Sequence, residues 1–210
     1  MTKKIVMIHG MWGDSWYWEN FKHYFEEKGY QCYIPTLRYH DVDPKDNPNP
    51  NLGTISLIDY AQDLKEYLRN LDEKPILMDH SMGGLLAQIL GAQGLAKGLV
   101  LLTSASPSGI NALKFSVIKS FWSVLTKWRF WRNSSRISFN AAVYSMLHLL
   151  SEADQKAAYE RFVYESGRAA AAIRFWLFDS KGASRVDESE VTCPVLVVSR
   201  AEDRITLLCV

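Results

Sequence analysis

The sequence of 210 residues predicts an α/β fold, in which a mainly parallel sheet of about five strands carries helices on both faces. The first observation is that short, nearly continuous apolar runs recur along the chain, which is typical of strands buried on both sides. The second is that stretches with helical spacing of apolar residues separate these runs, as in strand–helix–strand units. The third is a long segment without strand-like runs, which predicts a helical insertion.

Five apolar runs are expected to form the strands, because Gly, Pro or polar residues bound each of them. They are residues 5–8, 31–34, 75–78, 99–103 and 194–199. Between the second strand and the next helix, residues 41–53 hold three of the seven prolines and have no periodicity, so this segment is predicted to be a loop.

Three helices are expected between the first four strands. The first covers residues 15–28 and ends at Gly29, a residue suited to the left-handed conformation that terminates helices. The second begins after Ser56, which forms a capping-box pattern with Asp59 three residues on. The third covers residues 82–93.

The alternation stops at residue 110, and residues 110–185 are predicted to form a helical cap inserted into a core of residues 1–109 and 186–210. Residues 113–131, the first cap helix, hold six aromatic side chains. We favour burial of this aromatic face against the core. The alternative is a lid that lines an acyl pocket or touches a lipid interface.

Composition excludes several classes of protein. Apolar residues make up 48% of the chain and the formal net charge is +1, so neither disorder nor nucleic-acid binding is indicated. No apolar run is long enough for a stable membrane insertion, and the run at residues 5–8 is too short for a signal peptide. The three cysteines, Cys32, Cys193 and Cys209, lack disulfide or zinc spacing, which favours a reducing, cytoplasmic location.

The strongest chemical signal is the sequence PILMDHSMGG at residues 75–84. A strand that runs into HSMGG and then into a helix is the setting of a nucleophile elbow, which lifts Ser81 above the sheet at a helix N-terminus. Gly83 leaves room for the helix to approach the strand. His80 is expected to point away from Ser81 into the packed side of the turn.

The second signal is HGMWG at residues 9–13, directly after the first strand. Acyl transfer requires two N–H donors aimed at the oxyanion of the tetrahedral intermediate. The backbone amides of Met11 and of Met82, the residue after Ser81, are the candidates. Gly10 supplies the turn, and His9 is interpreted as a structural residue that braces this loop.

The third signal follows the fifth strand, in the sequence RAED at residues 200–203. An acid a few residues beyond a buried strand can orient a histidine base. Asp203 is the candidate acid, and Glu202 is the less favoured alternative.

These motifs, in this order, resemble the α/β-hydrolase superfamily, in particular its serine esterase and lipase-like branch with a helical cap. The resemblance covers essentially the whole chain. It implies hydrolysis of a small-molecule carboxylic ester with a small or medium acyl group. It also implies Ser81 as nucleophile, Asp203 as the triad acid and Met11 and Met82 as oxyanion donors, with no metal or organic cofactor.

The chain departs from the family at two positions near these motifs. The family usually has glycine two residues before the serine, where this chain has Asp79. A carboxylate in that crowded turn is expected to be solvated or paired. Arg200 stands where the family often has glycine before the acid, and a pair between Arg200 and Asp79 is one hypothesis.

The catalytic histidine of the family follows the acid, whereas none of the five histidines of this chain follows Asp203. We therefore expect the chain to be truncated at its C-terminal end, with the fifth strand's edge bare and prone to self-association. His40 and His148 are candidate surrogate bases, or else surface or packing residues. The alternatives to an esterase are a catalytically impaired relic of the family and a lactone or amide hydrolase.

Overall fold

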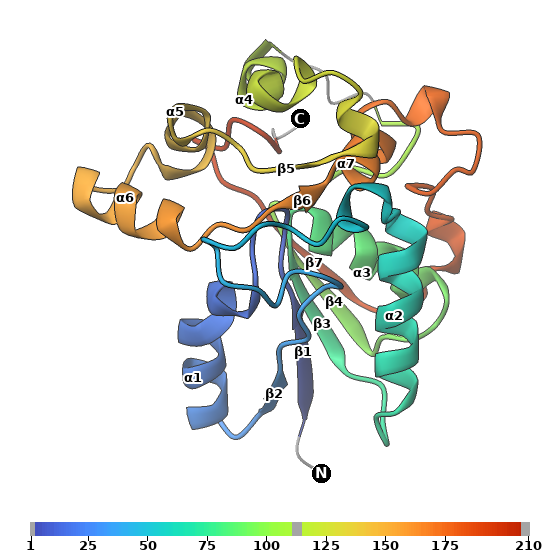
Figure 1. Ribbon diagram of the computed structural model, residues 1–210. Helices are drawn as coiled ribbons and strands as arrows, with labels where there is room; N and C mark the ends of the chain where they lie inside the picture. Colours follow the sequence, from blue (N-terminus) through green and yellow to red (C-terminus); the bar gives the residue numbers. More distant parts are fainter. Residues whose placement is uncertain (1–2, 111–114, 207–210) are drawn as a thin grey trace.

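The computed structural model describes residues 3–110 and 115–206 (Figure 1). Its central sheet has five parallel strands in the order β2-β1-β3-β4-β7, which confirms the predicted fold class. The strands are β1 (Lys4–Ile8), β2 (Gln31–Tyr33), β3 (Ile76–His80), β4 (Gly98–Leu102) and β7 (Val195–Val198). Each predicted apolar run overlaps one of them, with boundaries that differ by at most two residues.

Helices cover both faces of the sheet, with α1 (Glu19–Glu27) on one side and α2 (Leu57–Arg69) and α3 (Met82–Ala92) on the other (Figure 1). The capping box of α2 is confirmed, because the Ser56 hydroxyl accepts the Asp59 amide while the Asp59 carboxylate accepts the Ser56 amide. The predicted first helix begins as a separate 3-10 turn, η1 (Ser15–Trp18). Gly29 has a φ of +82°, as a helix-terminating glycine should.

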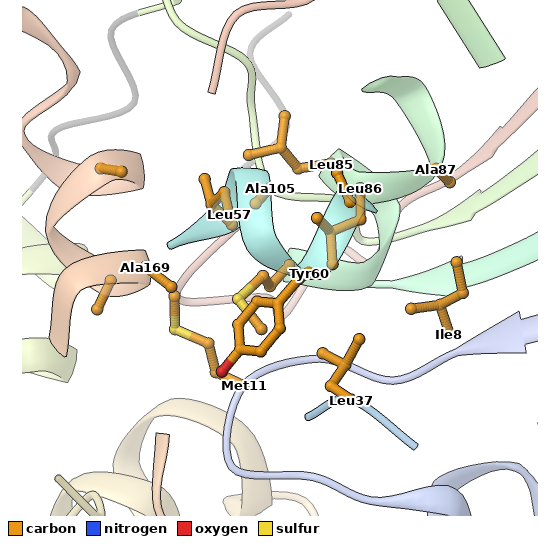
Figure 2. Packing of buried hydrophobic residues seen from close by; sticks show 14 of the residues in the cluster. Ile8, Met11, Leu37, Leu57, Tyr60, Leu85, Leu86, Ala87, Ala105 and Ala169 are labelled. Carbon is orange, nitrogen blue, oxygen red and sulfur yellow. The ribbon is translucent and has the colours of Figure 1, made fainter. Parts of the chain in front are cut away.

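The two faces of β1 bury different side chains. Ile5 and Met7 pack with Trp18 on the α1 side, whereas Val6 and Ile8 belong to the larger core under α2 and α3. Figure 2 shows part of this larger core, where Leu85 and Leu86 of α3 lie near Leu57 and Tyr60 of α2. The alternation follows from the two-residue period of a strand, and it explains why β1 reads as a continuous apolar run.

The insertion, defined here as residues 115–191 between β4 and β7, holds the remaining elements. Its helices are α4 (Phe115–Leu125), α5 (Phe139–Ala142), a π-helical turn η4 (Val143–Leu147), α6 (Glu152–Glu160) and α7 (Gly167–Arg174). Shorter 3-10 turns are η3 (Phe130–Arg132), η5 (Trp176–Phe178) and η6 (Glu188–Glu190), and η2 (Leu52–Thr54) ends the predicted loop of the core.

The prediction of a purely helical insertion is incomplete, because β5 (Ser134–Ser135) and β6 (Glu165–Ser166) pair as an antiparallel ladder. Strands of two residues are too short to show a period of two in the sequence. The ladder joins segments about 30 residues apart and lies above the loop that precedes α2 (Figure 1).

The aromatic face of the first insertion helix is not buried as predicted. Phe121 and Phe130 are buried, but Phe115, Trp122 and Trp128 are exposed. Residues 113 and 114, the first of the predicted helix, lie outside the described residues. No helix in the described part of the chain is long and apolar enough to cross a membrane.

Among the described residues no strand pairs with the outer edge of β7, as predicted. Its four side chains, all Val or Leu, are between 40% and 65% exposed. β7 pairs with β4 along one edge only, since it is the last strand in the sheet order.

Candidate active site

Ser81 occupies a strained turn between β3 and α3. Its backbone has a φ of +54° and a ψ of −118°, a conformation that a residue with a side chain rarely adopts. The turn is held by hydrogen bonds on both sides: the Ser81 amide donates to the Leu102 carbonyl at 3.2 Å, and the Ser81 carbonyl accepts the Ala105 amide at 2.9 Å. The strain is therefore imposed by the surrounding sheet, and it projects the side chain out of the strand.

Two glycines let the turn approach its neighbours. A Cβ on Gly83 would collide with the backbone carbonyls of Ile8 and His9 at the end of β1. A Cβ on Gly10 would lie 3.0 Å from the Cβ of Ser81. The loop that follows β1 therefore abuts Ser81 directly, as a shared role of the Met11 and Met82 amides requires.

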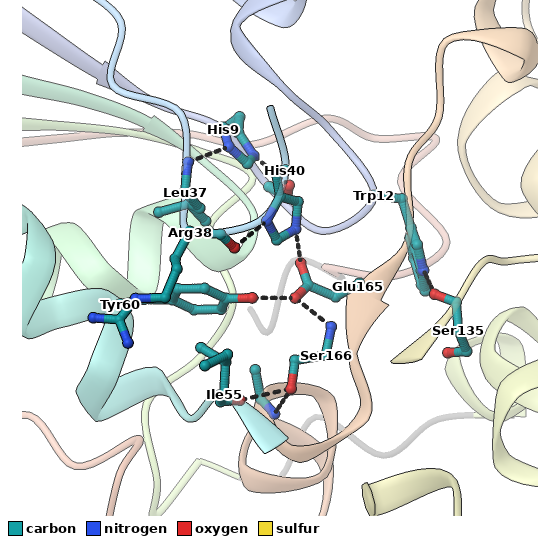
Figure 3. A network of polar contacts seen from close by, with 12 residues as sticks. His9, Trp12, Leu37, Arg38, His40, Ile55, Tyr60, Ser135, Glu165 and Ser166 are labelled. Carbon is teal, nitrogen blue, oxygen red and sulfur yellow. Dashed lines mark hydrogen bonds and ion pairs between the residues drawn. The ribbon is translucent and has the colours of Figure 1, made fainter. Parts of the chain in front are cut away.

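His9 braces this loop from beneath. Its Nε2 accepts the Leu37 amide at 3.1 Å, so its Nδ1 carries the proton and donates to the Gly10 carbonyl at 2.9 Å (Figure 3). Burial and the charge of the neighbouring His40 lower the pKa of His9 to about 4. The neutral ring therefore persists at physiological pH and fixes the backbone of Gly10.

Met11 follows Gly10 and Met82 follows Ser81, so both candidate oxyanion amides are adjacent in the chain to the close approach of Gly10 and Ser81. Met82 is the first residue of α3, so its amide has no partner within the helix. In the described part of the chain, neither amide donates a hydrogen bond to another group. Both methionine side chains are buried, which anchors the two amides.

Trp12 connects the same loop to the insertion. Its indole Nε1 donates to the Ser135 carbonyl at 3.0 Å, and its own carbonyl accepts the Val163 amide at 3.0 Å. Its ring packs against Phe121 of α4, with ring centroids 5.6 Å apart. Trp12 belongs to the HGMWG motif, but the motif gives no indication that Trp12 contacts residues more than a hundred positions away.

Asp203 lies in the loop after β7 with a largely buried side chain. Its carboxylate accepts the amides of Ile205 and Thr206, both at 2.8 Å, and the Thr206 hydroxyl at 2.9 Å. Arg200 pairs with it at 3.3 Å. The hypothesis that Arg200 pairs with Asp79 is therefore wrong.

Asp79 is fully buried in the sheet, between Ile8 of β1 and Leu101 of β4. Neither carboxyl oxygen has a hydrogen-bond partner among the described residues. The expectation that this side chain is solvated or paired is wrong. Burial raises the pKa of Asp79 well above its usual value and so favours the neutral carboxylic acid.

His80 lies against the ring of Tyr17, edge to face, with centroids 5.8 Å apart. Burial, followed by the positive charge of Arg200, lowers the pKa of His80 to about 4, although the charge of Asp203 acts in the opposite direction. The side chain thus packs between Tyr17 and Gly10, where its Nδ1 lies 3.0 Å from the position of a Cβ built on Gly10.

The two proposed surrogate bases have different surroundings. His40 is fully buried and both its ring nitrogens are engaged, by the Arg38 carbonyl at 3.0 Å and by Glu165 at 3.1 Å. His148 follows η4 in the insertion, and its two ring nitrogens are buried without partners among the described residues. In the described part of the chain, no hydrogen bond joins a histidine to Ser81 or Asp203.

Glu165 is the centre of a buried network that sequence reasoning missed. Its carboxylate accepts the Tyr60 hydroxyl at 2.9 Å and the Ser166 amide at 2.6 Å, and it contacts His40 (Figure 3). Burial favours the neutral acid, but the charge of His40 and these hydrogen bonds hold the pKa of Glu165 below its usual value. The available signal was a single acid within an otherwise apolar and aromatic stretch at residues 162–165.

A cavity of about 900 Å³ lies between α7 and the start of α2. It is lined by Ser56, Arg168 and aromatic residues that include Trp131 and Phe175. Neither Ser81 nor Asp203 contributes to its wall, so this cavity is separate from the elbow.

Comparison with known proteins identifies a family and several structural neighbours. Residues 5–208 match the family described as the alpha/beta hydrolase family. A curated relative, Methylesterase 7 of Arabidopsis thaliana, is 34% identical over 91 residues, which is 41% of this chain and 33% of that protein. The match thus spans about a third of the relative's length.

Solved structures with the same fold cover nearly the whole chain. A methylesterase from Arabidopsis has a TM-score of 0.70 at 12% identity, with 99% of this chain and 81% of that chain covered. An extracellular α/β-hydrolase from a Paenibacillus species has a TM-score of 0.68 at 18% identity, with 97% and 91% covered. Polyneuridine aldehyde esterase has a TM-score of 0.63 at 16% identity, with 98% and 93% covered.

Proposed function

This chain belongs to the alpha/beta hydrolase family, and from that premise we propose that it is a serine hydrolase that cleaves carboxylic esters of small or medium acyl groups. The observation that carries the proposal is the strained Ser81 turn, with the Gly10 loop packed directly against it. The esterase names of the methylesterase and polyneuridine aldehyde esterase neighbours support an ester as the substrate.

In the proposed reaction, the Ser81 hydroxyl oxygen attacks the acyl carbon of the ester while a general base takes the hydroxyl proton. The amides of Met11 and Met82 donate to the oxyanion that forms. The base then gives its proton to the leaving alcohol, and water releases the acid from the acyl-enzyme. Asp203 has the position of the acid that orients a histidine base.

We propose that residues 110–185 act as the cap over this site, with residues 1–109 and 186–210 as the core. The Trp12 contacts with Ser135 and Val163 support this role, because they tie the candidate oxyanion loop to the insertion. We place the protein in the cytoplasm, since the thiols of Cys32 and Cys193 are free. Cys209 lies outside the described residues.

The proposal is tested by assaying p-nitrophenyl acetate and butyrate with the wild-type chain and with Ser81→Ala. We expect the variant to lose roughly tenfold or more of the rate, because it lacks the attacking oxygen. Ser104→Ala is the matched control, since Ser104 lies beside α3 and its hydroxyl, within the described residues, bonds Gln88 and Ala105 and not Ser81. Equal rates for wild type and Ser81→Ala would contradict the proposal.

A second candidate is a catalytically impaired member of the family. The observation in its favour is that Asp203 is satisfied by Arg200, Ile205 and Thr206 rather than by a histidine among the described residues. In that case added imidazole should raise the ester-cleavage rate of the wild-type chain more than that of Ser81→Ala. A Ser81-dependent rate that imidazole leaves unchanged would favour the fully competent enzyme.

A further inference from the structure

Helix α4 carries apolar side chains on two opposite faces. One face, with Val117, Phe121 and Val124, is buried against the rest of the molecule. On the opposite face Phe115 and Trp122 are 79% and 62% exposed, and Ile118 between them is 40% exposed. The spacing of three and four residues aligns these three side chains in one outward stripe.

Two more exposed tryptophans follow α4 in the chain, and the second of them, Trp131, also lines the cavity between α7 and α2. Trp128 is 86% exposed and Trp131 is 49% exposed. Large exposed apolar surfaces are uncommon on monomeric proteins and mark interaction sites. Tryptophan, like tyrosine, is enriched where proteins meet the headgroup region of a bilayer.

The same stretch is basic and contains no acid. Lys119, Lys127, Arg129 and Arg132 are exposed beside the aromatic residues, and no Asp or Glu occurs anywhere between residues 80 and 151. None of these four cations forms a salt bridge within the described residues. Within the described residues, the apolar stripe therefore has cations near it in the chain that form no ion pair with a carboxylate.

We infer that residues 115–132 form a surface that docks on anionic lipid headgroups. The rings enter the boundary between headgroups and acyl chains, and the lysines and arginines contact the lipid phosphates, as in interfacial amphipathic helices. An anionic bilayer fits this combination better than a protein partner, because the rings and cations lie along one helix and its following turn. The helix lies on the membrane and does not span it, as its length requires.

The test is co-sedimentation of the wild-type chain with vesicles of phosphatidylcholine alone, or with phosphatidylglycerol added. We expect roughly tenfold more protein on the anionic vesicles, and loss of the binding at high salt. Trp122→Ser should weaken binding roughly tenfold and Lys127→Glu at least fivefold. Ser81→Ala should bind like the wild type, which separates this proposal from the proposed esterase activity.

The matched controls are Tyr24 of α1, which is 53% exposed, and Lys28, which directly follows α1 and lies over the Tyr24 ring. Tyr24→Ser and Lys28→Glu should leave vesicle binding unchanged. If Trp122→Ser fails to fold by circular dichroism, Trp128→Ser takes its place, since that residue lies outside the helix. Equal binding to neutral and anionic vesicles, or unchanged binding of both tryptophan variants, would overturn the proposal. The proposal would also be overturned if the wild type does not bind vesicles but forms a dimer that Trp122→Ser dissociates.

Discussion

At the scale of the residue, the positive φ of Ser81 has an energetic consequence. A non-glycine residue in such a conformation costs about 1–3 kcal/mol, and glycine removes most of that cost. We predict that Ser81→Gly raises the free energy of unfolding by about 1 kcal/mol while ester hydrolysis is lost. Urea denaturation measures the first effect and the p-nitrophenyl assay the second.

Ser104→Gly is the control, because Ser104 is not among the residues with positive φ and gains nothing from glycine. A Ser81→Gly variant that is less stable than the wild type would show that the turn is not strained.

Asp79 gives a second prediction, because a pKa that differs between the folded and unfolded chain makes the free energy of unfolding depend on pH. The unfolded chain loses the Asp79 proton above pH 3.8, whereas the buried carboxyl keeps it because its pKa is raised. Stability is therefore lost as the pH rises above 3.8. We predict that Asp79→Asn is more stable than the wild type at neutral pH, by at least about 1 kcal/mol, since the amide cannot ionise.

The stability gained by Asp79→Asn should shrink as the pH falls from neutral toward 4. Urea denaturation of both proteins across this pH range measures the difference. Asp72→Asn is the control, because Asp72 is an exposed partner of Lys4. A gain that is the same at acid and neutral pH would contradict a raised pKa for Asp79.

Local motifs made the residues around Ser81 predictable. The elbow, Gly83 and the His9–Gly10 turn depend on contacts whose partners are short segments with recognisable sequence. Asp79 and Glu165 were not predictable in this way, because the burial of an acid depends on which segments meet in three dimensions. Glu165 contacts His40, which is 125 positions away in the chain.

At the scale of the element, Glu165 joins strand β6 of the insertion to the core through His40 and Tyr60. The raised pKa of His40 contributes stability below pH 6.5 that is lost as the pH rises through the raised value. The lowered pKa of Glu165 contributes stability above pH 4.5 that is lost as the pH falls. The pair is therefore most stabilising between these two values.

We predict that Glu165→Gln lowers the free energy of unfolding by about 3 kcal/mol at about pH 6, because it leaves a buried imidazolium without its counter-charge. The loss should be smaller above the raised pKa of His40, where the imidazole is neutral. Guanidinium denaturation at several pH values measures this. Glu152→Gln, which removes an exposed pair with Lys156, should leave the midpoint unchanged. A loss for Glu165→Gln that does not vary with pH would contradict the ion pair.

Most helices and strands were predictable because their apolar residues recur over enough positions to reveal the period of the element. The β5–β6 ladder was not, since each strand has two residues. The orientation of α4 was not predictable either, because both of its faces are apolar and the sequence alone does not show which one meets the core.

At the scale of the whole molecule, the bare edge of β7 is the main liability. Its apolar side chains are exposed, and among the described residues no strand pairs with its outer edge, so we expect a second copy to pair there. We predict concentration-dependent self-association in sedimentation velocity, and a shift toward monomer in Val197→Lys, because lysine blocks edge pairing. Tyr24→Lys on α1 is the control, with no expected change. A wild-type chain that remains monomeric at all concentrations would contradict this prediction.

The central claim is that Ser81 is the nucleophile of a serine hydrolase, and covalent labelling tests it most directly. The chain is incubated with a fluorophosphonate and its intact mass is measured, followed by peptide mapping. The account predicts one adduct, located on Ser81, that is retained in Ser104→Ala and absent in Ser81→Ala. An adduct on another residue, or the same labelling in Ser81→Ala, would contradict it.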